Sequence, residues 1–247
     1  MKTRFLFFFL LLFTLAVFPQ EEGQTFLELK DTGVEEFIKL HPEYDGRGTI
    51  IIVLDTGVDM GIDGLLKTST GETKVIDVQD FTGQGDMPLV EANLTSKDGK
   101  DVFENSSQGY SVFANKSKML KSADDVYWMS VLNETHLMNS GSGAQDLNGN
   151  GVKDDKYYMV TYKTTDGYWV VYFDTNGNGN LSDEKPLRNY KENFDSFTIE
   201  NQKGLTPITM ALNIFPDEKR ISLFFDDGSH GTHCAGIAAG FNIGDAG

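Results

Sequence analysis

Two short segments, 175 residues apart, each present a side chain that could move a proton. Asp55 directly follows the apolar, β-branched run 49–54, and His230 lies between Gly228 and Gly231. An imidazole can take a proton from a hydroxyl group, and a carboxylate can hold the ring in the required tautomer and stabilise its charged form. The two segments therefore predict acyl-transfer chemistry, with Asp55 as the orienting carboxylate and His230 as the general base.

The elements around both residues are predicted to bring them to one end of a sheet. The run 49–54 is typical of a strand buried on both faces of a parallel sheet, and ligand crevices lie at the carboxyl ends of such strands. Residues 231–241 are rich in Ala and Gly and predict a tightly packed helix that opens at His230. The dipole at a helix N-terminus disfavours an imidazolium and so keeps the ring able to accept a proton.

Two neighbours of the histidine have chemistry of their own. His233 and Cys234 follow it within four residues. No third metal ligand at a useful spacing accompanies His233, and Cys234 is the sole cysteine, so no internal disulfide exists. We expect structural roles for both, as a small packed residue in the case of Cys234.

The two motifs together resemble those of the subtilisin-like serine peptidases. The carrying residues are Asp-Thr-Gly at 55–57 after an apolar strand and His-Gly-Thr-His-x-Ala-Gly at 230–236. Subtilisin has the chain order Asp, His, Ser, and the sequence ends at Gly247 before any serine block. The resemblance therefore implies a serine peptidase of which this chain is an N-terminal fragment, inactive alone because the nucleophilic serine is absent.

Further segments are similar to the tripeptidyl peptidase II family, subtilases with a long insertion between Asp and His. They are 42–48, 166–169 and Leu-Arg-Asn-Tyr-Lys-Glu at 187–192. This resemblance implies peptide substrates, release of tripeptides from free N-termini, no required cofactor and assembly into homo-oligomers. Two alternatives stay open: a subtilase endopeptidase that shares the insertion, and a non-catalytic secreted module that binds calcium.

The expected fold class is α/β: the N-terminal part of a subtilisin-like parallel-sheet domain with a β-rich insertion between the Asp and His blocks. We expect residues 24–80 to form the first part of the catalytic domain, with the Asp block. The insertion should occupy 81–222, and the His block and its helix should occupy 223–247. A helix is predicted at 34–40 and a strand at 74–80.

Within the insertion, polar residues 81–125 predict irregular structure, whereas 208–215 and 221–225 read as strands. Asp166-Gly167 between two β-rich runs predicts a hairpin. A two-residue turn pairs Val160 with Phe173. It also places one set of side chains on a shared face: Val160, Tyr162, Trp169, Val171 and Phe173.

Two loops share the pattern Asp-x-Asn-Gly-Asn-Gly, which matches the first half of an EF-hand-type calcium loop. Asn-Gly is also common turn chemistry, and the acid expected at position 12 is Tyr157 in one loop and Lys185 in the other. Calcium thus stays an open prediction. Its candidate ligands are Asp146, Asn148, Asn150 and Asp154 in the first loop and Asp174, Asn176 and Asn178 in the second, where Asp183 or Glu184 could add a displaced ligand.

Composition sets the remaining expectations. The 247 residues carry a net charge of −16 with no basic cluster beyond the first four residues, so nucleic acid is excluded as a partner. Lys2 and Arg4 precede the apolar run 5–18. This run is too short to span a bilayer and predicts a signal peptide at 1–20, with an uncleaved anchor as the rival. The expected location is therefore secreted or periplasmic, without a stable membrane span.

Overall fold

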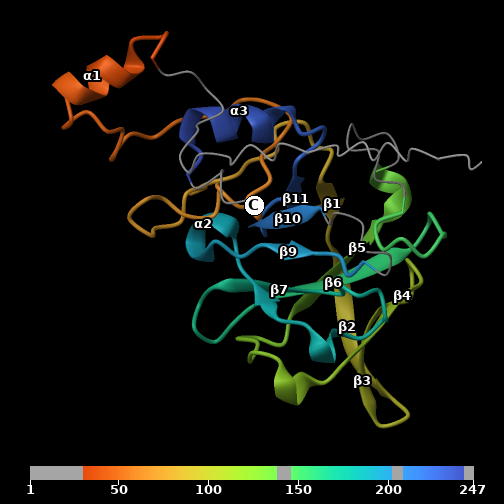
Figure 1. Ribbon diagram of the computed structural model, residues 1–247. Coiled ribbons are helices and arrows are strands. Elements are labelled where there is room, and N and C mark those ends of the chain that lie inside the picture. The colour runs from red at the N-terminus through yellow and green to blue at the C-terminus, as the bar shows by residue number, and fades with distance from the viewer. Residues whose placement is uncertain (1–29, 138–145, 202–207, 242–247) are drawn as a thin grey trace, which may run out of the picture. The chain divides into compact units, whose positions relative to one another are not determined.

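The computed structural model describes residues 30–137, 146–201 and 208–241 (Figure 1). The chain divides into two compact units, residues 1–49 with 244–247 and residues 50–243. In the first unit the described residues form the predicted helix, α1 (Val34–Leu40). The predicted signal peptide lies outside the described residues. No helix in the described ranges is long and apolar enough to cross a membrane.

The second unit is built on two antiparallel sheets. In the seven-stranded sheet the order is β4-β3-β2-β5-β6-β7-β8, and in the four-stranded sheet it is β1-β11-β10-β9. In the larger sheet the strands are β2 (Val90–Lys97), β3 (Lys100–Asn105), β4 (Tyr110–Ala114), β5 (Tyr127–Asn133), β6 (Lys156–Lys163), β7 (Trp169–Phe173) and β8 (Pro186–Leu187). In the smaller sheet they are β1 (Asp86–Pro88), β9 (Phe197–Thr198), β10 (Thr209–Phe215) and β11 (Arg220–Phe225).

Helices are few and short in the described part of this unit. The α-helices there are α2 (Tyr190–Asn193) and α3 (His230–Ala239). Three 3-10 turns join its strands: η1 (Lys116–Lys118), η2 (Glu134–Leu137) and η3 (Leu181–Asp183). The helix predicted to open at His230 is confirmed as α3, and the strands predicted at 208–215 and 221–225 are confirmed as β10 and β11.

The expected parallel sheet is not seen among the described residues. The run 49–54 and the segment 74–80 form no strand, and the side chains of Ile52 and Leu54 are 79% and 83% exposed. A parallel strand forms only where a neighbouring strand offers its hydrogen-bonding edge. No described segment pairs with 49–54 in this way: β10 and β11 pair with each other, and their other edges pair with β9 and β1. The fold described is therefore β-rich and antiparallel rather than α/β.

The prediction of irregular structure at 81–125 was wrong, because four strands lie there. Asp98 and Gly99 both have positive φ, at 52° and 74°, and join β2 to β3. Asp-Gly with positive φ at both central residues is the tight hairpin turn whose twist suits the flanking strands. The many polar residues on the exposed faces of these strands obscured, in the sequence, the apolar residues that face the core, among them Val102 and Val112.

The predicted hairpin around Asp166-Gly167 is present, but its register differs by one residue. Val160 pairs with Tyr172, and Phe173 pairs with Met159. The cause is the turn: the Thr164 N–H donates to Tyr168 O at 2.8 Å and the Gly167 N–H to Thr164 O at 2.9 Å, so the loop is longer than two residues. A one-residue shift moves every side chain of one strand to the other face.

Both faces of the seven-stranded sheet are buried at β6 and β7. Val160 and Tyr162 pack with Val170 and Tyr172 in one apolar cluster that also includes Phe103 and Met129. Val171 and Phe173, which were expected on that same face, lie in a second cluster instead. This second cluster joins the two sheets. It contains Leu212 of β10 and Leu223 of β11 from the smaller sheet, and Met159 of β6 with Val171 and Phe173 of β7 from the larger one.

A third, smaller cluster leads to the site. Met60, Val78, Tyr190 and Ala211 are buried together, at 4%, 4%, 2% and 0% exposure. The Tyr190 hydroxyl donates to Val75 O at 2.8 Å, and the Asn213 amide donates to Val78 O at 2.7 Å. These contacts tie the loops after Asp55 to α2 and β10. In Figure 1, β10 and β11 lie between α3 and the larger sheet.

Candidate active site

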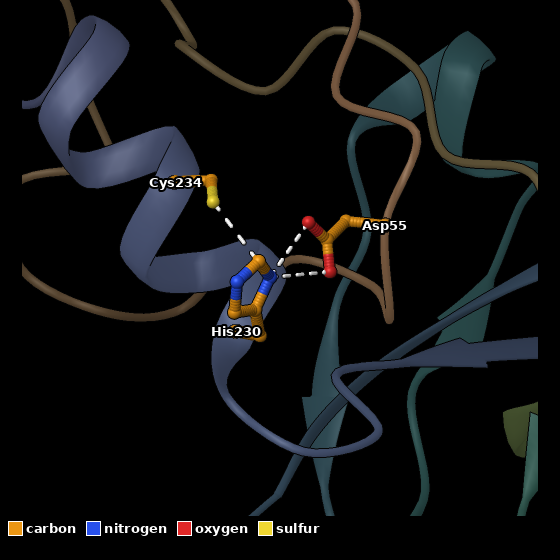
Figure 2. A group of neighbouring side chains, drawn as sticks. All are labelled: Asp55, His230 and Cys234. Atoms are coloured by element: carbon orange, nitrogen blue, oxygen red, sulfur yellow. Dashed lines mark hydrogen bonds and ion pairs between the residues drawn. The ribbon is translucent and has the colours of Figure 1, made fainter.

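Asp55 and His230 meet although they are 175 residues apart. The Nδ1 atom of His230 lies 2.9 Å from Oδ1 and 2.8 Å from Oδ2 of Asp55. His230 comes from the first turn of α3 and Asp55 from the loop that follows the apolar run (Figure 2). The structure thus brings together the two residues that the sequence singled out, with the carboxylate on the Nδ1 side of the ring.

Close backbone packing fixes this contact. The Gly231 N–H donates to Thr56 Oγ1 at 3.2 Å, and the Asp227 N–H donates to Thr56 O at 2.8 Å. A Cβ on Gly231 would overlap Gly57 O, and a Cβ on Gly57, which has φ of 112°, would overlap Phe225 O. Glycine at both positions therefore lets the first turn of α3 approach the loop that carries Asp55.

A threonine on α3 adds a second link. The Thr232 hydroxyl donates to an oxygen of Asp226 and accepts the Asp59 N–H at 2.8 Å. The other oxygen of Asp226 accepts the Ser229 N–H at 2.9 Å. Thr232 and Asp226 therefore hold the start of the helix against the segment after Asp55.

The electrostatics of the pair favour an ionised carboxylate. The Thr56 N–H donates to Asp55 Oδ1 at 2.8 Å, and this bond, followed by the one to His230, lowers the pKa of Asp55 below its ordinary value of 3.8. An ionised Asp55 acts as acceptor only, so its partner Nδ1 must carry the proton. The Nε2 atom of His230 is then left as the proton acceptor, and the His230 side chain is 68% exposed.

Cys234 lies one helical turn after His230. Its Sγ atom is 3.7 Å from His230 Nδ1, and the residue is half-buried. His233 is exposed and lies on the same helix, but it is not part of this cluster.

The first Asp/Asn loop has a closed hydrogen-bond pattern. Asp146 accepts the N–H groups of Asn150 and Gly151 at 3.0 and 2.8 Å. The side-chain amides of Asn148 and Asn150 both donate to Asp155 Oδ2, at 2.8 and 2.6 Å. The carboxylate that meets the amides is thus that of Asp155, the residue after the predicted Asp154.

The second loop repeats this pattern at the same spacing. Asp174 accepts the N–H groups of Asn178 and Gly179 at 3.0 and 2.9 Å. The amides of Asn176 and Asn178 donate to Asp183 Oδ2 at 3.2 and 2.9 Å. Each loop gathers two carboxylates and two amides, oxygen donors of the kind calcium takes, with the second acid at position 10 rather than 12. Calcium binding stays a prediction for both loops.

Several positioning residues were not assigned a role from the sequence. Asp226 and Thr232 link the Asp and His blocks, and Glu134 accepts hydrogen bonds from the backbone of the first Asp/Asn loop. Glu134 is fully buried and accepts the N–H groups of Leu147 and Asp155 at 2.8 and 3.2 Å. Asp226 follows the apolar strand β11, as Asp55 follows the apolar run 49–54, so the sequence held a signal for it. The acceptor role of Glu134 depends on the tertiary fold, and the sequence held no signal for it.

Comparisons with known proteins find distant relatives over most of the chain. The chain is 29% identical over 280 aligned positions to tripeptidyl-peptidase 2 of Oryza sativa subsp. japonica, covering 89% of this chain and 20% of that protein. It is 28% identical to pyrolysin of Pyrococcus furiosus, covering 81% of this chain and 15% of pyrolysin. The chain matches no protein-family model.

A solved structure of the same kind of protein also matches the fold of this chain. The crystal structure of tripeptidyl peptidase 2 superposes with a TM-score of 0.61 at 19% identity, covering 86% of this chain and 20% of that one. The chain spans about one fifth of the length of the tripeptidyl-peptidase 2 sequences of Oryza sativa and Arabidopsis thaliana. Over most of its length it is thus a distant homologue, at about 28% identity, of one region of the subtilase proteins tripeptidyl-peptidase 2 and pyrolysin.

Proposed function

We propose that this chain supplies the base and the orienting carboxylate of an exported serine peptidase of the tripeptidyl peptidase II type. The observation that carries the proposal is the contact between His230 Nδ1 and the Asp55 carboxylate at 2.8 Å. The attacking hydroxyl would come from a serine outside these 247 residues. The substrates would be peptides, and the products tripeptides released from free N-termini.

The mechanism follows from the roles of the two side chains. Asp55 holds the tautomer of His230 that carries its proton on Nδ1, which leaves Nε2 free to take the serine proton during attack on the scissile carbonyl. The resulting imidazolium is stabilised by the ionised Asp55, and it then returns the proton to the leaving amine. Hydrolysis of the acyl-enzyme repeats these transfers with water as the nucleophile.

Replacing His230 by Ala in the full-length gene product tests the assignment. We expect kcat to fall by about 10⁶-fold, as when a triad histidine is removed. His233→Ala is the matched control, because His233 lies on the same helix outside the cluster, and it should leave kcat near its wild-type value. Turnover of His230→Ala within tenfold of wild type would exclude His230 as the base.

The product pattern tests the finer proposal. Peptides with a free N-terminus should yield tripeptides in steps, and the same peptides with an acetylated N-terminus should resist cleavage. Mass spectrometry of the products distinguishes this from internal cleavage, which would favour the endopeptidase alternative. Assembly into homo-oligomers is part of the proposal and is checked by light scattering of the full-length protein.

A further inference from the structure

The two Asp/Asn loops contain four Asn-Gly pairs, two in each loop. In such a pair the backbone nitrogen of the glycine can attack the asparagine side chain, because glycine has no Cβ to hinder the approach. Asparagine is accordingly among the thermolabile residues. The structure decides which pair is free to react. The pairs are Asn148-Gly149, Asn150-Gly151, Asn176-Gly177 and Asn178-Gly179.

Carboxylates protect the second pair of each loop. The Gly151 N–H donates to Asp146 Oδ2 at 2.8 Å, and the Gly179 N–H donates to Asp174 Oδ2 at 2.9 Å. A nitrogen whose proton is held by a carboxylate must give up that hydrogen bond before it can attack, and hydrogen bonds to charged groups are the stronger kind. The asparagines of these two pairs are therefore protected, although both are exposed to solvent.

Burial protects the first pair of the first loop. Asn148 is 7% exposed, and Gly149 beside it is also buried. The Asn148 amide donates to Asp155 Oδ2 at 2.8 Å, which holds the side chain in place. Solvent that would remove the Gly149 proton has little access, so this pair should react slowly.

The remaining pair, Asn176-Gly177, lacks both kinds of protection. Asn176 is half-buried and Gly177 is exposed. The Gly177 N–H makes no hydrogen bond of normal geometry to a described residue. Burial raises the pKa of Asp174, and of the three N–H groups that oppose this rise, that of Gly177 contributes least. Its nitrogen is therefore the most available of the four.

We propose that Asn176 is a site of spontaneous deamidation, with water as the only other reactant. The Gly177 nitrogen loses its proton to solvent and bonds to Cγ of Asn176. The Cγ–Nδ2 bond breaks, and the amide nitrogen takes up a proton and leaves as ammonia. Water then opens the cyclic imide at one of its two carbonyls, which leaves aspartate or isoaspartate at this position without any change in oxidation state.

The product places a charge where the loop uses an amide. The Asn176 amide donates to Asp183 Oδ2 at 3.2 Å, so after deamidation a carboxylate faces a carboxylate. The same loop covers part of the edge of β4, because the Phe113 N–H donates to Gly179 O at 2.9 Å. Repulsion that opens the loop therefore frees the edge of β4, and a free strand edge is a site for pairing with another chain.

Peptide mapping of the full-length gene product tests the site. The protein is kept at mildly alkaline pH with EDTA, folded in one sample and in urea in the other. Trypsin then releases the segments 122–153 and 164–188, which hold two Asn-Gly pairs each. In urea the four asparagines should convert at similar rates. In the folded protein Asn176 should convert about tenfold faster than the other three, the factor that corresponds to one hydrogen bond to a charged group.

The effect on β4 is measured by hydrogen exchange after ageing. The matched control is Asn176→Gln, which keeps the amide but must close a larger ring and so reacts far more slowly. Exchange at the Phe113 N–H should rise by about tenfold in the aged wild type and stay unchanged in the aged variant.

Two results would overturn the inference. Conversion of Asn176 no faster than that of Asn178 in the folded protein, or no conversion at all, would remove the site. Equal exchange at Phe113 in both aged proteins would remove its link to β4. Neither measurement requires peptidase activity, so failure of the proposed function and failure of this site are separate outcomes.

Discussion

Two glutamates of the β-rich part have pKa values displaced in opposite directions. Burial beside Asp174 and Asp183 raises the pKa of Glu184 above its ordinary value of 4.5, although Thr175 donates to its carboxylate at 2.6 Å. The Glu104 carboxylate pairs with Lys97 at 2.5 Å, and this bond lowers its pKa. The protonated form of Glu184 and the ionised form of Glu104 are therefore the ones that the fold favours.

These directions predict opposite pH trends in stability. A carboxyl group whose pKa is higher in the folded chain than in the unfolded chain stabilises the fold below its unfolded pKa, and this stabilisation is lost as pH rises through the folded pKa. A carboxyl group whose pKa is lower in the folded chain stabilises the fold above its unfolded pKa, and this stabilisation is lost as pH falls through the folded pKa. From acid to neutral pH, wild type should therefore lose stability relative to Glu184→Gln and gain it relative to Glu104→Gln. Urea unfolding of the three chains between about pH 3 and 7 measures this, and parallel trends would contradict the pKa directions.

At the scale of elements, the approach of α3 to the loop after Asp55 depends on Gly231. A Cβ at this position would overlap Gly57 O and touch the Asp55 side chain. Gly231→Ala should therefore push the first turn of α3 away and lengthen the His230–Asp55 contact. In the full-length protein we expect kcat to fall by about 100-fold, the effect of a misplacement of about 1 Å. Wild-type kcat in this variant would show that the glycine contact does not position the base.

Calcium binding by the two Asp/Asn loops can be tested through the thermal stability of the chain. If calcium binds, a concentration of 100 times its Kd should stabilise the chain by about 2.7 kcal/mol, seen as a rise in Tm that EDTA reverses. Asp155→Asn should reduce the rise, since Asp155 meets both amides, whereas the matched change Asp154→Asn should not. No rise in Tm with calcium would leave these loops as turns closed by their own hydrogen bonds.

The sequence was informative where local chemistry decides the structure. The Asp and His motifs, α3, β10, β11 and the hairpin at Asp166-Gly167 all follow from short-range pattern. The hairpin register did not, because the bonds between Thr164 and Tyr168 that close its loop are not encoded by the Asp-Gly pair. The prediction of a parallel sheet was also wrong. An apolar run indicates that a segment is suited to a buried strand, but it does not show whether a neighbouring strand is present to pair with it.

On the scale of the whole molecule, that apolar run stands apart from an otherwise charged chain. Ile50, Ile52 and Leu54 are 71%, 79% and 83% exposed and pair with no described strand. A short, β-branched segment with free backbone groups and no charge is a template for pairing with another chain. The net charge of −16 opposes such contact only through repulsion that salt screens.

We therefore expect the 247-residue chain to associate in a concentration- and salt-dependent way. The double change Ile52→Lys and Leu54→Lys should shift it toward monomer, because charges on an exposed edge prevent strand pairing. Sedimentation velocity at low and high salt measures this. The matched control is Ile237→Lys on α3, which removes a 60% exposed apolar side chain without touching the run. If Ile237→Lys restores the monomer as well as the double change does, the association depends on general apolar exposure; a monomeric wild type would refute it altogether.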